Sequence, residues 1–130
     1  MVGRRTFELS KGWDGNPPLG VHTFVVGHAI PDGWPRPDTP FTFVTEGGVQ
    51  EAVAKAHAGD QIVALSGANL TQGCLNAGLV DQLRIDLVPV LLGGGIRYLD
   101  NLAHAPVWLD GPRVIEGIGV THLIYDVRPR

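Results

Sequence analysis

Two short stretches of this chain combine residue types that suit a bound anion. The first, Ser66-Gly67-Ala68-Asn69-Leu70-Thr71, follows an apolar, β-branched run and precedes a pattern with helical spacing. Small residues at such a junction let backbone N–H groups at a helix N-terminus approach a phosphate. A plain strand-to-helix connection, with Ser66 or Asn69 capping the helix, explains the same residues, and both interpretations stay open.

The second stretch is Gly3-Arg4-Arg5-Thr6, close to the start of the chain. Two guanidinium groups and a hydroxyl at the start of a short helix suit a phosphate, including the 2′-phosphate that distinguishes NADP from NAD. A solvated Arg pair near a terminus is the alternative. The anion interpretation becomes stronger because the chain contains a second turn suited to phosphate.

The remaining candidates for chemistry are weaker. The run Leu92–Arg97 lacks the spaced glycines of a dinucleotide fingerprint and the Lys of a P-loop, so it predicts a turn. No two of the five histidines are spaced as metal ligands on one expected helix, and no metal site is predicted. Cys74 has no C-x-x-C partner and is predicted to be a small core residue. The carboxylates are scattered, so no catalytic residue is predicted, and the zinc signature of nucleobase deaminases is absent.

The elements that would position these turns alternate between strand and helix. Hydrophobic periodicity and turn residues predict strands at Thr23–Val26, Phe41–Thr45, Gln61–Ser66, Gln82–Leu92, Arg113–Gly117 and Gly119–Val127. Three helices are expected. The first is a short helix capped by Thr6, the second runs over Gly48–Ala58 and ends at Gly59-Asp60, and the third runs over Asn69–Ala77. Leu83, Ile85 and Leu87 should share one face of their strand. The order predicts an α/β protein with a largely parallel sheet and a C-terminal antiparallel hairpin.

Length and composition restrict the class of protein. A chain of 130 residues predicts a single domain, 1–130, and 44% hydrophobic with 18% charged residues indicates a globular one. A net charge of −3 without any Lys/Arg run disfavours a nucleic-acid partner. One cysteine, no apolar run long enough for a membrane span and no signal sequence lead us to expect a cytoplasmic protein without a membrane partner.

The whole chain also resembles a known family. The resemblance rests on three segments: MVGRRTFE, IVALSGANLTQGCLNAGLVDQLRIDLVPVLLGGGIRYL and the C-terminal hairpin. Together they resemble the dihydrofolate reductase superfamily and, within it, the RibD C-terminal domain, the reductase part of the riboflavin-biosynthesis deaminase/reductase. The resemblance implies a three-layer αβα fold with a mostly parallel sheet.

The resemblance further implies NADPH-dependent hydride transfer to a C=N or C=O group. The implied substrate is a heterocyclic or ribosylamino-pyrimidine compound, as in 5-amino-6-(5-phosphoribosylamino)uracil reductase or dihydrofolate reductase. Family members hold the cofactor phosphates with the Gly-Arg-x-Thr segment and the Gly turn, and the adenosine end lies after an intervening strand. The positions matching these segments are Gly3, Arg4, Arg5, Thr6, Gly27, His28, Ser66, Gly67, Ala68, Asn69, Leu70 and Thr71.

Two departures from the family pattern affect these expectations. Gly67-Ala68 stands where dihydrofolate reductases carry Gly-Gly. Family members also carry a central strand and a pocket-forming helix ahead of Gly-Arg-x-Thr, so we expect an N-terminally truncated domain. Sheet edges left open in this way favour a homodimer. The alternative function is a non-catalytic or partner-completed NADP-binding scaffold domain.

Overall fold

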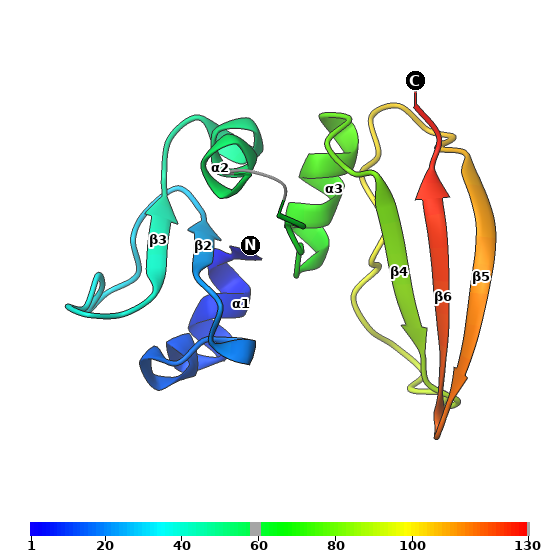
Figure 1. Cartoon of the computed structure of the whole chain (residues 1–130), viewed down its shortest axis with the longest axis horizontal. Coiled ribbons are helices and arrows are strands. Elements are labelled where there is room, and N and C mark those ends of the chain that lie inside the picture. The colour runs from blue at the N-terminus through cyan, green and yellow to red at the C-terminus, as the bar shows by residue number, and fades with distance from the viewer. Residues whose placement is uncertain (58–60, 130) are drawn as a thin grey trace.

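The computed structural model describes residues 1–57 and 61–129 as an α/β chain with two three-stranded sheets. Figure 1 shows these sheets on either side of helix α3. The helices, including two 3-10 helices, are α1 (Arg4–Leu9), η1 (Lys11–Gly15), η2 (Pro18–Gly20), α2 (Gly48–Ala56) and α3 (Ala68–Asn76). The strands are β1 (Val2–Gly3), β2 (Thr23–Val26), β3 (Phe41–Val44), β4 (Gln82–Leu87), β5 (Leu109–Gly117) and β6 (Val120–Val127).

The first sheet is parallel, in the order β1-β2-β3, and it carries the hydrophobic core of its half of the chain. Phe7 of α1 is 1% exposed and packs with Val2, Val25 and Phe41. The Phe7 ring meets Trp34 and Phe41 edge to face, with centroids 4.9 and 5.1 Å apart. Because aromatic burial dominates small cores, this cluster fixes α1 on the sheet.

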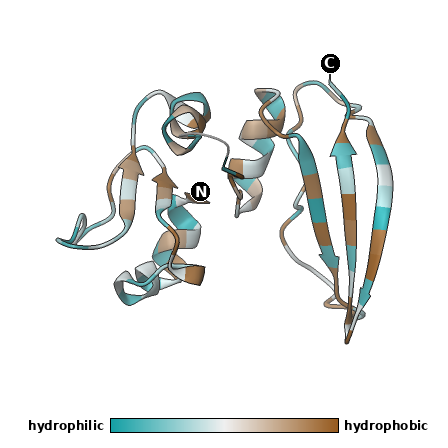
Figure 2. Cartoon of the chain, viewed as in Figure 1, coloured by the Kyte–Doolittle hydropathy of each residue, from teal (hydrophilic) through white to brown (hydrophobic). Residues whose placement is uncertain are grey.

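The second sheet is antiparallel, in the order β4-β6-β5. Apolar and polar residues alternate along β4 (Figure 2), as expected for a strand with one face toward other residues. Leu83 and Ile124 are its buried residues, at 4% and 7% exposure. The expected shared face of Leu83, Ile85 and Leu87 is confirmed, since these residues pair with alternate residues of β6.

The predicted α/β class and the C-terminal hairpin are confirmed. The observed bounds of α2 and α3 differ from the expected bounds by no more than two residues, which is the usual uncertainty of helix termini. The expected helix end at Ala58 and Gly59-Asp60 lies outside the described residues. In the part of the chain that is described, no helix has the length and apolar character needed to cross a membrane.

The structure corrects the predicted strand over Gln82–Leu92. The strand ends at Leu87, because Pro89 lacks an N–H group and Gly93 has a φ of 73°, which breaks an extended ladder. The described partner of β4 is β6, in antiparallel pairing, so β4 does not join the parallel sheet. The strand–helix–strand alternation therefore predicted α3 and the start of β4 but the wrong neighbour for β4.

Two further local predictions are wrong. The segment Gln61–Ser66 is not a strand; Ser66 alone forms a parallel bridge, to Val2. The Ser66 N–H donates to the Met1 carbonyl at 2.9 Å, so the segment still approaches β1 where it meets α3. Thr6 does not cap α1 either: Gly3, in an extended conformation, is the N-cap, and Thr6 lies within the helix.

Candidate functional site

The three segments singled out in the sequence meet at one edge of the parallel sheet. Gly3 ends β1, Gly27 follows β2, and Gly67 follows the bridge at Ser66. The Gly27 N–H donates to the Val44 carbonyl at 3.1 Å, which ties the end of β2 to the end of β3. Ligands of α/β proteins bind outside the carboxyl ends of parallel strands, so this edge is where a site is expected.

Gly67 brings the two predicted anion-binding turns into contact. Its φ is +109°, and a Cβ atom there would lie 3.0 Å from the Thr6 Oγ1 atom and 3.9 Å from the Gly3 nitrogen. The Gly3 N–H also points to the Ser66 carbonyl, at 3.4 Å. A side chain at position 67 would therefore be strained and would fill the space beside Thr6, so the absence of a Cβ keeps a small cradle open.

Gly27 places the third predicted segment against the same helix. A Cβ atom at Gly27 would lie 2.8 Å from the Arg4 Cβ atom. The Arg4 Nε donates to Glu8 Oε1 at 2.9 Å, so this guanidinium already has an anionic partner. Arg5 is exposed, and among the described residues no side chain pairs with its guanidinium. Of the two arginines, Arg5 is thus the one available to an added anion.

The first turn of α3 leaves its backbone donors open. Gly67 is the N-cap residue, and neither Ser66 nor Asn69 makes a side-chain capping bond, so the capping interpretation of these residues is wrong. The first N–H groups of a helix have no acceptor within it, and the helix dipole adds a partial positive charge at that end. The N–H groups of Ala68, Asn69 and Leu70 are therefore the donors that an anion would meet.

Two of the predicted residues contribute no accessible side chain. Leu70 is 6% exposed and Thr71 is 2% exposed. The Thr71 Oγ1 atom lies 3.4 Å from the Tyr98 hydroxyl, and the Thr71 N–H donates to the Gly67 carbonyl at 3.0 Å. Within the predicted set, Leu70 can act through its backbone, whereas Thr71 holds α3 to the segment around Tyr98.

A polar anchor on α3 was not predicted from the sequence. Gln72 is 5% exposed, and its Nε2 donates to the carbonyls of Arg97 at 3.3 Å and Tyr98 at 2.9 Å. One turn later, Asn76 donates to the Asn101 carbonyl at 3.0 Å. These bonds fix the segment after the glycine run to the helix that carries the candidate site. The available signal in the sequence was a pair of side-chain amides, Gln72 and Asn76, four residues apart in a helix of mostly small and apolar residues.

A cleft of about 380 Å³ adjoins the Gly27 side of the candidate site. Val44, which accepts the Gly27 hydrogen bond, is part of its lining, together with Phe43, Thr45, Glu46, Gly47, Glu51 and Lys55. Lys55 is paired with Glu51 at 3.1 Å. Carboxylates in the lining repel phosphate, so this cleft suits a neutral, polar group such as a ribose or a base.

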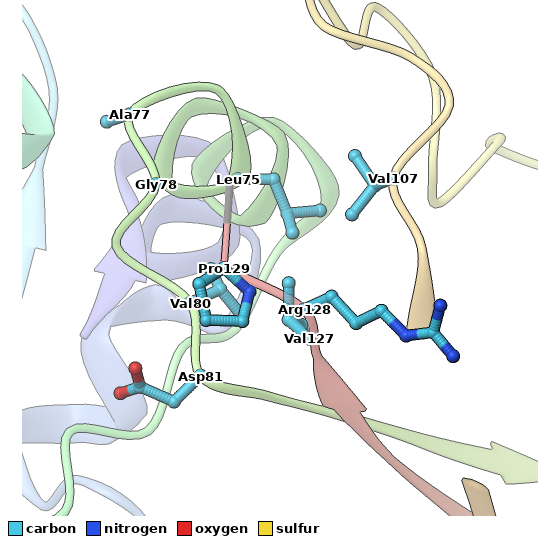
Figure 3. A pocket seen from close by; sticks show the side chains of 9 residues that line it. All are labelled: Leu75, Ala77, Gly78, Val80, Asp81, Val107, Val127, Arg128 and Pro129. Carbon is cyan, nitrogen blue, oxygen red and sulfur yellow. The ribbon is translucent and has the colours of Figure 1, made fainter. Parts of the chain in front are cut away.

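A second cleft, of about 460 Å³, lies at the other end of α3 (Figure 3). Its lining includes Leu75, Val107 and Val127, with Arg128 at the rim. Arg128 is bound to Asp110 at 2.5 Å, and this hydrogen bond lowers the pKa of the Asp110 carboxyl. None of the predicted site residues lines this cleft, so it is separate from the candidate site.

Cys74 is buried within α3, as predicted for a core residue. Burial raises the pKa of its thiol, which disfavours the reactive thiolate form. Within residues 1–57 and 61–129, no cluster of three or more His, Cys, Asp or Glu side chains is arranged to hold a metal ion.

Comparison with known proteins gives a family and a fold. Residues 45–109, half of the chain, match the RibD C-terminal domain. This region contains Ser66–Thr71 but not Gly3–Thr6 or Gly27-His28. No curated protein matches the sequence.

Among solved structures, a crystal structure from Shewanella sp. PV-4, of a protein named for riboflavin biosynthesis, superposes with a TM-score of 0.74. The two sequences are 24% identical, and the match covers 98% of this chain and 72% of that chain. It supports the dihydrofolate-reductase-like αβα class.

Proposed function

Because this chain belongs to the RibD C-terminal domain family, we propose that it is an NADPH-binding, reductase-type domain. The observation that carries the proposal is the position of Gly67 beside Thr6, at the uncapped start of α3. Two segments more than sixty residues apart, each suited to phosphate by residue type, meet at one sheet edge. Such an arrangement suits a ligand with several phosphates, as a dinucleotide has.

Each residue set has a distinct role in this proposal. The N–H groups of Ala68 to Leu70 bind the pyrophosphate, and Gly67 keeps the approach open. Arg5 pairs with the 2′-phosphate, because its guanidinium is exposed and Arg4 is engaged by Glu8. Gly27-His28 and the adjoining cleft receive the adenosine end. NADPH, when bound, supplies a hydride, here to a heterocyclic or ribosylamino-pyrimidine substrate.

A second candidate function is cofactor binding without turnover. Glu8, the carboxylate closest in sequence to the Gly3–Thr6 turn, is exposed and paired with Arg4. An exposed carboxylate that is already paired with a cation is not positioned as a general acid for a bound substrate. Binding of NADPH with no consumption of it, across dihydropterin and ribosylaminopyrimidine compounds, would favour this candidate.

Titration of the chain with NADPH and with NADH, followed by quenching of Trp fluorescence, tests the proposal. We expect Arg5→Ala to weaken NADPH binding about tenfold to a hundredfold, the usual worth of one charge-assisted phosphate contact, and to leave NADH binding nearly unchanged. Arg113→Ala, on the outer strand of the other sheet, is the matched control. Equal losses for both cofactors would refute the role of Arg5, and absence of NADPH binding by the parent chain would refute the function.

A further inference from the structure

Arg4 lies next to the Gly27 segment of the candidate site. A Cβ atom at Gly27 would lie 2.8 Å from the Arg4 Cβ, 3.3 Å from its Cδ and 3.5 Å from its Cγ. The aliphatic part of Arg4 therefore passes close to the backbone just after β2. Gly27 in turn donates its N–H to Val44, which lines the adjoining cleft. The fold thus places Arg4 beside the segment proposed to receive the adenosine end.

The guanidinium of Arg4 is held by a carboxylate one turn along α1. Its Nε donates to Glu8 Oε1 at 2.9 Å, and the two side chains are 39% and 44% exposed. Both groups are therefore within reach of a dissolved ligand. Carboxylate and phosphate oxygens accept hydrogen bonds from the same N–H donors of a guanidinium. Glu8 and a phosphate bound near Gly27 would therefore compete for Arg4.

The cleft next to Gly27 contains a second ion pair of this kind. Lys55 Nζ lies 3.1 Å from Glu51 Oε1, again with a spacing of four residues along a helix, and both residues line the cleft. Arg4 and Lys55 are thus two cations near the candidate site that are already balanced by carboxylates. The attraction of the site for phosphate therefore depends on the partners of its basic residues as well as on their number.

We propose that Glu8 is a specificity-determining residue, which lowers the preference of this site for NADPH over NADH by occupying Arg4. The inference rests on the proposed cofactor function. NADPH differs from NADH by its 2′-phosphate, so competition at Arg4 acts mainly on the cofactor that carries this group. An exposed ion pair is weak enough for a ligand to displace. Arg5 then supplies the main contact with the 2′-phosphate, and Glu8 determines how far Arg4 adds to it.

Glu8→Gln tests the proposal, because it removes the charge and keeps the size of the side chain. In titrations followed by Trp fluorescence, NADPH should bind about threefold to tenfold more tightly than to the parent, and NADH affinity should change less than about twofold. Asp110→Asn is the matched control, since it releases Arg128 from an exposed ion pair on the other sheet with the same change in net charge. It should change neither affinity.

The gain is expected to depend on Arg4. In the Arg4→Gln background, Glu8→Gln should leave NADPH affinity nearly unchanged. A gain as large as in the parent would indicate an effect of overall charge and would overturn the proposal. Because a helical ion pair at the surface contributes little to stability, these variants should fold like the parent, which thermal melting followed by circular dichroism checks.

A second measurement follows the ion pair itself. The nuclear magnetic resonance signal of the Arg4 Nε–H group, identified by its loss in Arg4→Gln, should shift when 2′,5′-ADP is added and not when 5′-AMP is added. A signal that does not respond to 2′,5′-ADP would overturn the proposal.

The outcomes distinguish this inference from the proposed function. A parent that binds NADPH, together with a Glu8→Gln variant of unchanged cofactor preference, would overturn the role of Glu8 and leave the function standing. A parent that binds neither NADPH nor 2′,5′-ADP would overturn both.

Discussion

At the scale of single residues, the candidate site depends on the absence of a Cβ atom at Gly67. Gly67 combines a φ of +109°, which L-residues rarely adopt, with a position where a Cβ atom would lie 3.0 Å from the Thr6 Oγ1. A positive φ alone is a common reason for glycine in a turn. Its position beside Thr6 is what links this glycine to the second predicted anion-binding turn.

Replacement of Gly67 by Ala tests both the positive φ and the position beside Thr6. We expect Gly67→Ala to lower the free energy of unfolding by about 1–3 kcal/mol through backbone strain and the close contact, and to weaken NADPH binding as well. Gly93→Ala is the matched control, since Gly93 has a φ of +73° and no atom within 4 Å of an added Cβ. Chemical denaturation and NADPH titration measure both quantities. Equal effects of the two substitutions on NADPH affinity would show that the Thr6 contact has no role.

At the scale of secondary structure, α3 connects the candidate site to the segment after the glycine run. Its N-terminal turn presents the open N–H groups, while Gln72 and Asn76 hold residues 97–103. The side-chain amide of Gln72 is buried and engaged on both its nitrogen and its oxygen. We therefore infer that this segment and the site turn are held as one unit.

Gln72→Leu should release that segment. The loss of buried side-chain hydrogen bonds should cost about 1–2 kcal/mol of stability. Amide hydrogen exchange should accelerate at residues 97–101 and not in β2 or β3. Gln50→Leu, an exposed position on α2, is the control and should change neither quantity. Unchanged exchange at residues 97–101 in Gln72→Leu would contradict the anchoring role.

At the scale of the whole molecule, the antiparallel sheet carries exposed apolar residues, among them Leu87, Trp108, Val114 and Ile115. Where such residues form a contiguous patch, they mark an interaction site more often than a surface in contact with water alone. The homodimer predicted from the sequence would cover part of this surface.

Thermal stability should depend on protein concentration in the homodimer predicted from the sequence. Association that favours the folded state stabilises it by mass action, so the Tm of the parent chain should rise as its concentration increases. Differential scanning calorimetry at several concentrations measures this, and a parent Tm that does not respond to concentration would argue against a dimer.

Much of the local structure could be predicted from the sequence. The apolar spacing of Gly48–Ala56 and the alternation of Leu83, Ile85 and Leu87 depend on residues near one another in the chain, and both were confirmed. Residue types also predicted the two candidate anion-binding turns, whose proximity at Gly3 and Ser66 the structure shows. The predicted strand over Gln61–Ser66 failed because a strand needs ladder bonds along its length, and only Ser66 has a bridging partner.

What the tertiary structure alone decided is which distant segments meet. No local pattern states that Gly67 lies beside Thr6, that Gln72 donates to the carbonyl of Tyr98, or that β4 pairs with β6. These contacts depend on side-chain packing and strand pairing between residues far apart in sequence. Hydrophobic periodicity reports only on residues that are near one another in the chain, so it does not reveal them. Residue types therefore determined the kind of chemistry this chain can support, and packing determined where those residues come together.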